Sequence, residues 1–103
     1  MKIGILNLEK LGRICIPKII ADNIGLVPKT EVEVFISHGE ICIRKYDASN
    51  LKNAEFTGII RRLDPLNRVT IPKEYLSILN IKVNSKVEFH LLEDNTMKVV
   101  KIN

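Results

Sequence analysis

An internal repeat constrains this chain more than any other feature. Residues 8–18 read LEKLGRICIPK, and residues 63–73, which follow at an interval of 55 positions, read LDPLNRVTIPK. Both segments contain an apolar residue, an acid, a turn that ends in Gly or Asn, an arginine, a short apolar strand and Pro-Lys. A chain of 103 residues that holds two copies of a half-length unit is expected to build one core from both halves, since neither half closes a core alone.

The local patterns predict the same order of elements in each half. Short apolar or alternating segments predict strands over residues 4–8, 13–16, 31–37 and 40–46, and again over 57–63, 68–71, 86–92 and 97–102. Pro17 and Pro72 open brief helices over 18–23 and 72–79, and Gly25 and Asn80 end them. We therefore predict one half over residues 1–47, a polar linker over 48–56 and a second half over 57–103.

Composition describes an ordinary globular chain and leaves its function open. Hydrophobic residues make up 46% and charged residues 27%, and no apolar run approaches the roughly 20 residues that span a bilayer. The first residues show no export signal, so a cytoplasmic location and no membrane partner are expected. The net charge of +4 is compatible with nucleic acid, but each half carries eight basic and six acidic residues. Any nucleic-acid face must therefore come from how the charges are placed.

The sequence gives little support to catalysis or to a cofactor. It has no nucleophile elbow and no phosphate-binding glycine loop, so we predict that the chain is not an enzyme and binds no cofactor or small molecule. Cys15 and Cys42 lie within apolar strand patterns and are expected to be reduced, structural and at least half-buried. A metal site formed by these cysteines with His38 and His90 is the alternative, although the sequence has no close ligand pair such as C-x-x-C or H-x-x-x-H.

The repeated segments resemble the AbrB/SpoVT family of swapped-hairpin DNA-binding domains. Residues 57–64 (TGIIRRLD) and 66–72 (LNRVTIP) are similar to the family signature T-G-I-V-R-x-[VL]-D-x-L-G-R-[VI]-x-I-P, and residues 11–17 (LGRICIP) match its centre. The resemblance implies a mainly β fold with short helices, in which two tandem half-barrel repeats interleave their hairpins into one swapped-hairpin β-barrel. The related MraZ family shares such tandem arrangements. MazE-type antitoxins share the half-barrel but add a toxin-wrapping tail, which we do not expect here.

The resemblance also carries over DNA-facing residues. The family's arginine before the turn matches Arg61, and the arginine after the turn matches Arg68 and Arg13. Residues predicted to meet phosphates and base edges on one face are Arg61, Arg62, Arg68, Arg13, Lys73, Lys18 and Lys10. The alternative is that each turn arginine pairs with the acid of its own turn, Asp64 with Arg68 and Glu9 with Arg13.

Two departures from the family pattern affect this assignment. The family's two helix arginines fall on Leu76 and Ser77, and on Ala21 and Asp22, so neither half keeps them. The first half has Leu6 at the position of Arg61 and Asn7 at that of Arg62. We therefore expect the second half to carry most of the DNA contacts and the first to be mainly architectural.

The function that these features predict is a nucleoid-associated, double-stranded DNA-binding transcriptional regulator. The alternatives are a self-assembling structural module and a MazE-like, antitoxin-type protein that binds a partner. The self-complementary surfaces of pseudo-twofold units also favour homo-oligomers through the barrel edges.

Overall fold

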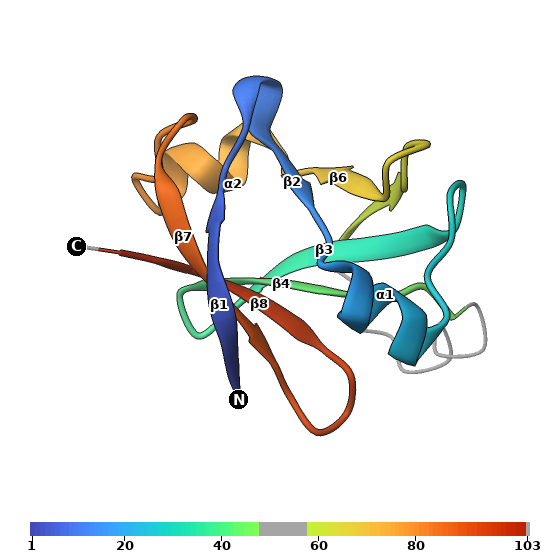
Figure 1. The fold of residues 1–103 in the computed structure, drawn as a ribbon. Helices are drawn as coiled ribbons and strands as arrows, with labels where there is room; N and C mark the ends of the chain where they lie inside the picture. Colours follow the sequence, from blue (N-terminus) through green and yellow to red (C-terminus); the bar gives the residue numbers. More distant parts are fainter. Residues whose placement is uncertain (48–57, 103) are drawn as a thin grey trace.

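The computed structural model describes residues 1–47 and 58–102, so the predicted linker over 48–56 lies outside the described residues. The described chain is mainly β with short helices, as predicted, and most element bounds differ by one or two residues from those expected. The elements in chain order are β1 (Lys2–Asn7), η1 (Lys10–Gly12), β2 (Arg13–Cys15), α1 (Lys18–Ile24), β3 (Glu31–Ser37), β4 (Glu40–Lys45), β5 (Ile59–Arg62), β6 (Arg68–Thr70), α2 (Lys73–Ile78), β7 (Lys86–Leu91) and β8 (Met97–Lys101) (Figure 1).

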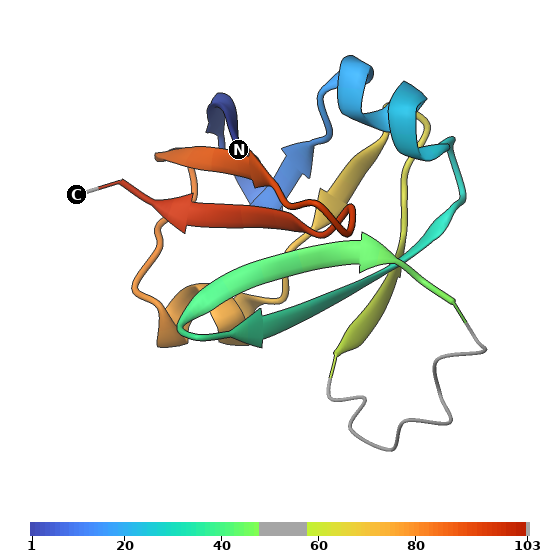
Figure 2. The same ribbon diagram turned by 90° about the horizontal axis from the view of Figure 1, so that it is seen from below.

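Six of the described strands form one antiparallel sheet in the order β1-β7-β8-β4-β3-β5. The two hairpins, β3–β4 and β7–β8, meet at the centre of this sheet, where β4 and β8 lie side by side (Figure 2). Each outer strand pairs with the hairpin of the other half, since β1 joins β7 and β5 joins β3. The hairpins are therefore exchanged between the halves, and neither half forms its sheet alone.

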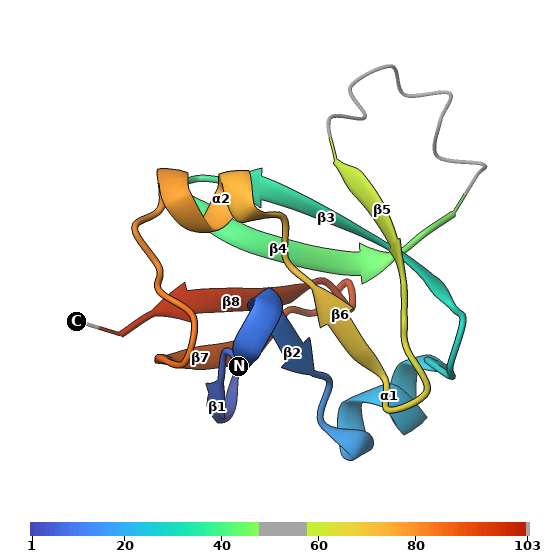
Figure 3. The same ribbon diagram turned by 90° about the horizontal axis from the view of Figure 1, so that it is seen from above.

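The closed β-barrel that we predicted is not present in the part of the chain that the structure describes. β1 and β5 remain the two edges of the six-stranded sheet, and no ladder joins them. Instead, β2 and β6 pair with each other in a separate two-stranded ribbon that lies across the sheet (Figure 3). The reason is the tight turn after each edge strand: it carries the chain out of the sheet and into the ribbon.

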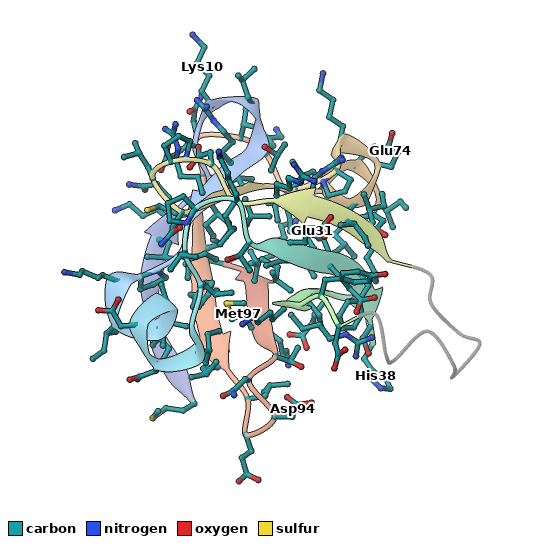
Figure 4. The ribbon with its side chains drawn as sticks, turned by 90° about the vertical axis from the view of Figure 1, so that its right-hand side faces the viewer. Lys10, Glu31, His38, Glu74, Asp94 and Met97 are labelled. Carbon is teal, nitrogen blue, oxygen red and sulfur yellow. The ribbon has the colours of Figure 1, made fainter. Side chains whose placement is uncertain are left out.

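The core fills the space between the sheet and the ribbon. Ile14 and Val69, the central pair of the ribbon, are both fully buried, as are Phe89 and Met97 from the second hairpin. Met97 lies within the interior of the molecule in the side-chain view (Figure 4). Because burying one such side chain contributes about 1.5–3 kcal/mol, the ribbon is held to the sheet mainly by its inward-facing residues. Neither described helix has the length and apolar character needed to cross a membrane.

Backbone hydrogen bonds recur at the interval of 55 residues that separates the repeated segments. The matched bonds tie the end of each edge strand to the opposite hairpin, and the start of each helix to the opposite turn. They are Leu8 N to Ser85 O (2.8 Å) and Leu63 N to Thr30 O (3.0 Å), and Ile16 N to Asn67 O (3.0 Å) and Ile71 N to Gly12 O (2.8 Å). The sequence repeat thus corresponds to a repeated pattern of backbone contacts.

Candidate nucleic-acid interface

The two-stranded ribbon sets the geometry of the candidate interface. Its register pairs Arg13 with Thr70, Ile14 with Val69 and Cys15 with Arg68. Since side chains alternate along a strand and the central pair faces the core, the other four residues share the opposite face. Viewed from above, the ribbon lies between α1 and α2 (Figure 3). Each end of the ribbon therefore combines residues from both halves of the sequence.

The Arg13 end of the ribbon gathers four of the predicted cations. Arg61 donates from Nε to the carbonyl oxygen of Thr70 at 3.3 Å, which brings the guanidinium of β5 beside the residue that faces Arg13. The bond from Ile71 N to Gly12 O holds the first turn against the start of α2. The residues that we assign to the Arg13 end are Lys10, Leu11, Arg13, Arg61, Thr70 and Lys73.

Arg13 is electrostatically unpaired within residues 1–47 and 58–102. Its Nε is buried and has no hydrogen-bond partner, and no described acid forms an ion pair with it. Lys10 is exposed and projects from the tip of the first turn, away from the body of the molecule (Figure 4). Glu74, which follows Lys73 in α2, is also exposed. A buried donor without a partner costs about 1–3 kcal/mol, which an incoming acceptor would recover in part.

The Arg68 end is less basic and more apolar. The bond from Ile16 N to Asn67 O holds the second turn against the start of α1. A shallow hollow lies here, and Leu66 beside it is 63% exposed. The residues that line the hollow include Leu6, Cys15, Pro17, Lys18, Pro65 and Leu66.

Arg68 itself is neutralised by two carboxylates. Its Nε lies 2.6 Å from Asp64 Oδ2, and its Nη1 lies 3.6 Å from Glu9 Oε1. The hydrogen bond to Asp64 raises the pKa of the Arg68 guanidinium, and the charge of Glu9 adds to this. Only 22% of the Arg68 side chain is exposed. The Arg68 guanidinium is therefore held by two carboxylates of the protein. No described carboxylate holds Arg13, which occupies the matching position of the repeat.

Asp64 also closes its own turn. Its Oδ1 accepts hydrogen bonds from the backbone nitrogens of Leu66 (2.9 Å) and Arg68 (2.8 Å). Partial burial raises the pKa of the Asp64 carboxyl, but the hydrogen bonds from the Arg68 backbone and side chain outweigh it, and the net pKa is lowered. The predicted pairing of Asp64 with Arg68 is confirmed.

The predicted pairing of Glu9 with Arg13 is wrong. The turn closes through the backbone, with Glu9 N donating to Arg13 O at 2.7 Å, but the Glu9 carboxylate reaches Arg68 on the neighbouring strand. Glu9 makes no side-chain cap to its own turn, whose next residues, Leu11 and Gly12, both have positive φ. The acid of the first turn is therefore available to the arginine of the second half.

The structure separates two predicted residues that are neighbours in sequence. Arg61 faces the same side of the sheet as its partner Val32, and Arg62 faces the other side with its partner Glu31. The structure therefore does not place all the predicted cations on a single face. Arg13, Arg61, Lys10 and Lys73 come together at one end, Arg68 and Lys18 lie at the other end, and Arg62 lies on the opposite face of β5.

Sequence reasoning missed Thr70 and two further lysines. Thr70 lies opposite Arg13 and accepts the Arg61 hydrogen bond, and the signal available was that it occupies the position matching Cys15 when the two repeated segments are aligned. Asn84 N donates to Leu8 O at 2.7 Å, so the segment that carries Lys82 and Lys86 lies beside the end of β1 that leads to the first turn. These lysines extend the basic character of the Arg13 end.

The two cysteines occupy different environments. Cys42 is buried, as predicted, but Cys15 is exposed, because Ile14 and not Cys15 occupies the inward position of the ribbon. Burial and the nearby Glu9 charge raise the pKa of the Cys15 thiol, so it is protonated at neutral pH. Across the described residues, no three side chains of His, Cys, Asp or Glu gather as metal ligands.

Comparisons with known proteins agree with the fold. Residues 60–103 match the family model described as antidote-toxin recognition MazE, bacterial antitoxin, which covers the second half of the chain. The chain is also similar to the solution structure of PHS018 from Pyrococcus horikoshii, with 18% sequence identity and a TM-score of 0.53 over 96% of this chain and 91% of that one. No curated protein matches the sequence. These matches support a MazE/AbrB-like, mainly β fold.

Proposed function

We propose that this chain is a double-stranded DNA-binding transcriptional regulator of the AbrB/SpoVT type, acting in the cytoplasm on the nucleoid. In this proposal residues 1–47 and 57–103 are tandem copies of one half-barrel domain that exchange their hairpins. The match of residues 60–103 to the MazE family model supports this for the second half, and the hydrogen bonds that recur at an interval of 55 residues support it for the first. We assign no catalytic activity and no cofactor to it.

The observation that carries the proposal is the pair of guanidinium groups at the Arg13 end. Arg13 and Arg61 flank Thr70, and neither forms an ion pair with an acid in the part of the chain that the structure describes. Guanidinium donors fit both phosphate oxygens and the O6 and N7 acceptors of guanine in the major groove. Lys10 and Lys73 add phosphate contacts at the same end, and Lys18 and Arg68 at the other end of the ribbon and Arg62 on the opposite face of β5 contribute less.

Salt dependence of DNA binding tests this proposal. Binding to a pool of genomic duplex fragments is measured by fluorescence anisotropy between about 50 and 200 mM salt. Four phosphate contacts would give a slope of about −3.6 in log affinity against log salt, which is a loss of roughly 100-fold over this range. Replacing both Arg13 and Arg61 by Ala should reduce the slope by about two. Wild-type protein that shows no salt-sensitive binding would refute the proposal.

A MazE-like partner-binding role is the second candidate, because the matching family model is described as a bacterial antitoxin. The apolar hollow at the Arg68 end is the surface that such a role would use. Leu66→Glu separates the two functions, since it places a charge in the hollow while leaving the Arg13 end intact. If the chain is a DNA-binding regulator, the Leu66→Glu variant should keep at least the part of the DNA affinity that the Arg13 end contributes. A chain that forms assemblies, binds no DNA and loses its assemblies in Leu66→Glu favours the second candidate.

A further inference from the structure

The two ends of the ribbon occupy matched positions of the repeat but differ in chemistry. At the Arg13 end the chain has Lys10, Arg61 and Thr70, and at the Arg68 end the corresponding positions hold Pro65, Leu6 and Cys15. Three matched pairs at the two ends keep the same character: Leu11 with Leu66, Arg13 with Arg68, and Lys73 with Lys18. The backbone is thus nearly symmetric, while the surface that it presents is not.

Ion pairing enlarges this difference. The acids of the two turns, Glu9 and Asp64, both form ion pairs with Arg68. The charge of Arg68 is therefore neutralised, whereas the cations of the Arg13 end are not neutralised by these acids. The segments beside the ends continue the trend. Lys82 and Lys86 adjoin the Arg13 end, where the corresponding positions beside the Arg68 end hold Val27 and Glu31, although Lys29 adds one cation there.

We infer that the chain recognises a non-palindromic DNA site, although its fold is built on a pseudo-twofold plan. This inference rests on the proposed function and specifies its target. The Arg13 end, where no described acid forms an ion pair with either the Arg13 or the Arg61 guanidinium, is assigned to a guanine-containing half of the site. The Arg68 end, with Leu6, Cys15 and Leu66 around its hollow, is assigned to a half rich in thymine, whose methyl groups accept apolar contacts.

This assignment follows from the energetics of matched half-sites. Two identical protein ends would gain equally from two identical half-sites, and selection would favour a palindrome. Here a guanine opposite the Arg68 end finds no free guanidinium, because withdrawing Arg68 would leave Asp64 and Glu9 unpaired. Each good bidentate contact discriminates between bases by about 1–3 kcal/mol, or roughly 5- to 150-fold. A preference of this size at one end only would be visible in the selected sequences.

Selection from random duplex DNA at about 150 mM salt tests the inference. We expect the recovered motif to be asymmetric, with conserved G·C pairs on one side. Arg61→Leu, which makes the Arg13 end resemble its counterpart, should lower affinity about tenfold and remove the preference on the guanine side alone. Arg61→Lys keeps the charge and should retain phosphate affinity while losing the guanine preference. Arg68→Leu should change the affinity less than threefold.

A gain of function provides the reciprocal test. Leu6→Arg places a guanidinium at the position that matches Arg61, and Pro65→Lys places an exposed cation at the position that matches Lys10. Leu6 packs partly against the core, so thermal unfolding is followed for each variant, and Pro65→Lys serves where Leu6→Arg does not fold. Leu6→Arg should raise affinity several-fold and make the selected motif more symmetric, whereas Pro65→Lys should raise affinity through a phosphate contact and leave the motif asymmetric.

The outcomes distinguish this inference from the proposed function. A palindromic motif for the wild type, or equal losses in Arg61→Leu and Arg68→Leu, would overturn the inference and leave DNA binding intact. Wild-type protein without salt-sensitive DNA binding would overturn both.

Discussion

The turns at Glu9–Gly12 and Asp64–Asn67 occupy equivalent positions, and their acidic side chains differ in length by one methylene. The shorter Asp64 reaches back to two backbone nitrogens of its own turn and to Arg68. The longer Glu9 caps nothing in its turn and crosses the ribbon to the same Arg68. Both acids therefore neutralise one arginine and leave Arg13 open. The different contacts of the two acids thus leave the Arg13 end, and not the Arg68 end, with a ribbon arginine that no described acid pairs.

The largest difference in the free energy of unfolding is expected when the two acids of the turns are replaced one at a time. Asp64→Ala breaks two backbone caps and an ion pair, so it should lower the free energy of unfolding by about 2–3 kcal/mol. Glu9→Ala removes only one long ion pair and should cost less than about 0.5 kcal/mol. Urea denaturation of both variants measures the difference. Equal losses would show that the two turns are held in the same way.

Acid should remove the contribution of Asp64. Since its folded pKa is lowered, the carboxylate stabilises the folded chain at pH values above the unfolded pKa of about 3.9. This stabilisation is lost as the pH falls through the lower, folded pKa, where the carboxyl takes up a proton in both states. The urea midpoints of wild type and Asp64→Asn should therefore differ at pH 7 and converge as the pH falls through the lowered folded pKa. A difference that persists in acid would exclude the charge of Asp64 as its cause.

The last residues of the two turns should respond differently to substitution. Gly12 has φ +78°, and an added Cβ would lie 3.2 Å from both Ile71 O and Leu76 Cδ1, so Gly12→Ala should cost about 1–2 kcal/mol. Asn67 has φ 55°, and Asn67→Gly keeps this conformation, losing one long bond to Leu26 O at 3.4 Å. That change should stay within about 0.5 kcal/mol. Thermal unfolding of the two variants provides the comparison.

The smallest free-energy difference is expected between the two ribbon arginines in DNA binding. Arg13→Ala should weaken binding about tenfold, or 1.4 kcal/mol, because it removes an unpaired guanidinium. Arg68→Ala should weaken it less than threefold, since that side chain is held by Asp64 and Glu9. Anisotropy titrations in one buffer compare them, and circular dichroism verifies that both variants fold. A larger loss in Arg68→Ala would place the interface at the other end.

Local features of the fold could be predicted because the signals for them are local. Pro17 and Pro72 precede α1 and α2, the positive φ of Gly25 and Asn80 follows these helices, and the hairpin turn at His38 and Gly39 has positive φ at both residues. The candidate site was predicted less well. Arg61 and Arg62 were assigned to one face although their strand directs them to opposite faces, and Cys15 was expected to be at least half-buried. The first error overlooked the alternation of side chains along a strand, and the second arose because the packing of the ribbon on the sheet decides which residues of a short strand face inward.

The sequence by itself determined the order of the elements, because proline, glycine, asparagine and alternating apolar positions act over a few residues, and it named the residues that could meet an anion. Only the tertiary structure decided which of those cations stand together. Pairing of β2 with β6 in the ribbon sets Thr70, which accepts the Arg61 hydrogen bond, opposite Arg13 of the first half, and it brings Glu9 of the first half to Arg68 of the second. These contacts join residues about 50 positions apart, and pairing at that separation is fixed by the burial of a shared core, which no local pattern encodes.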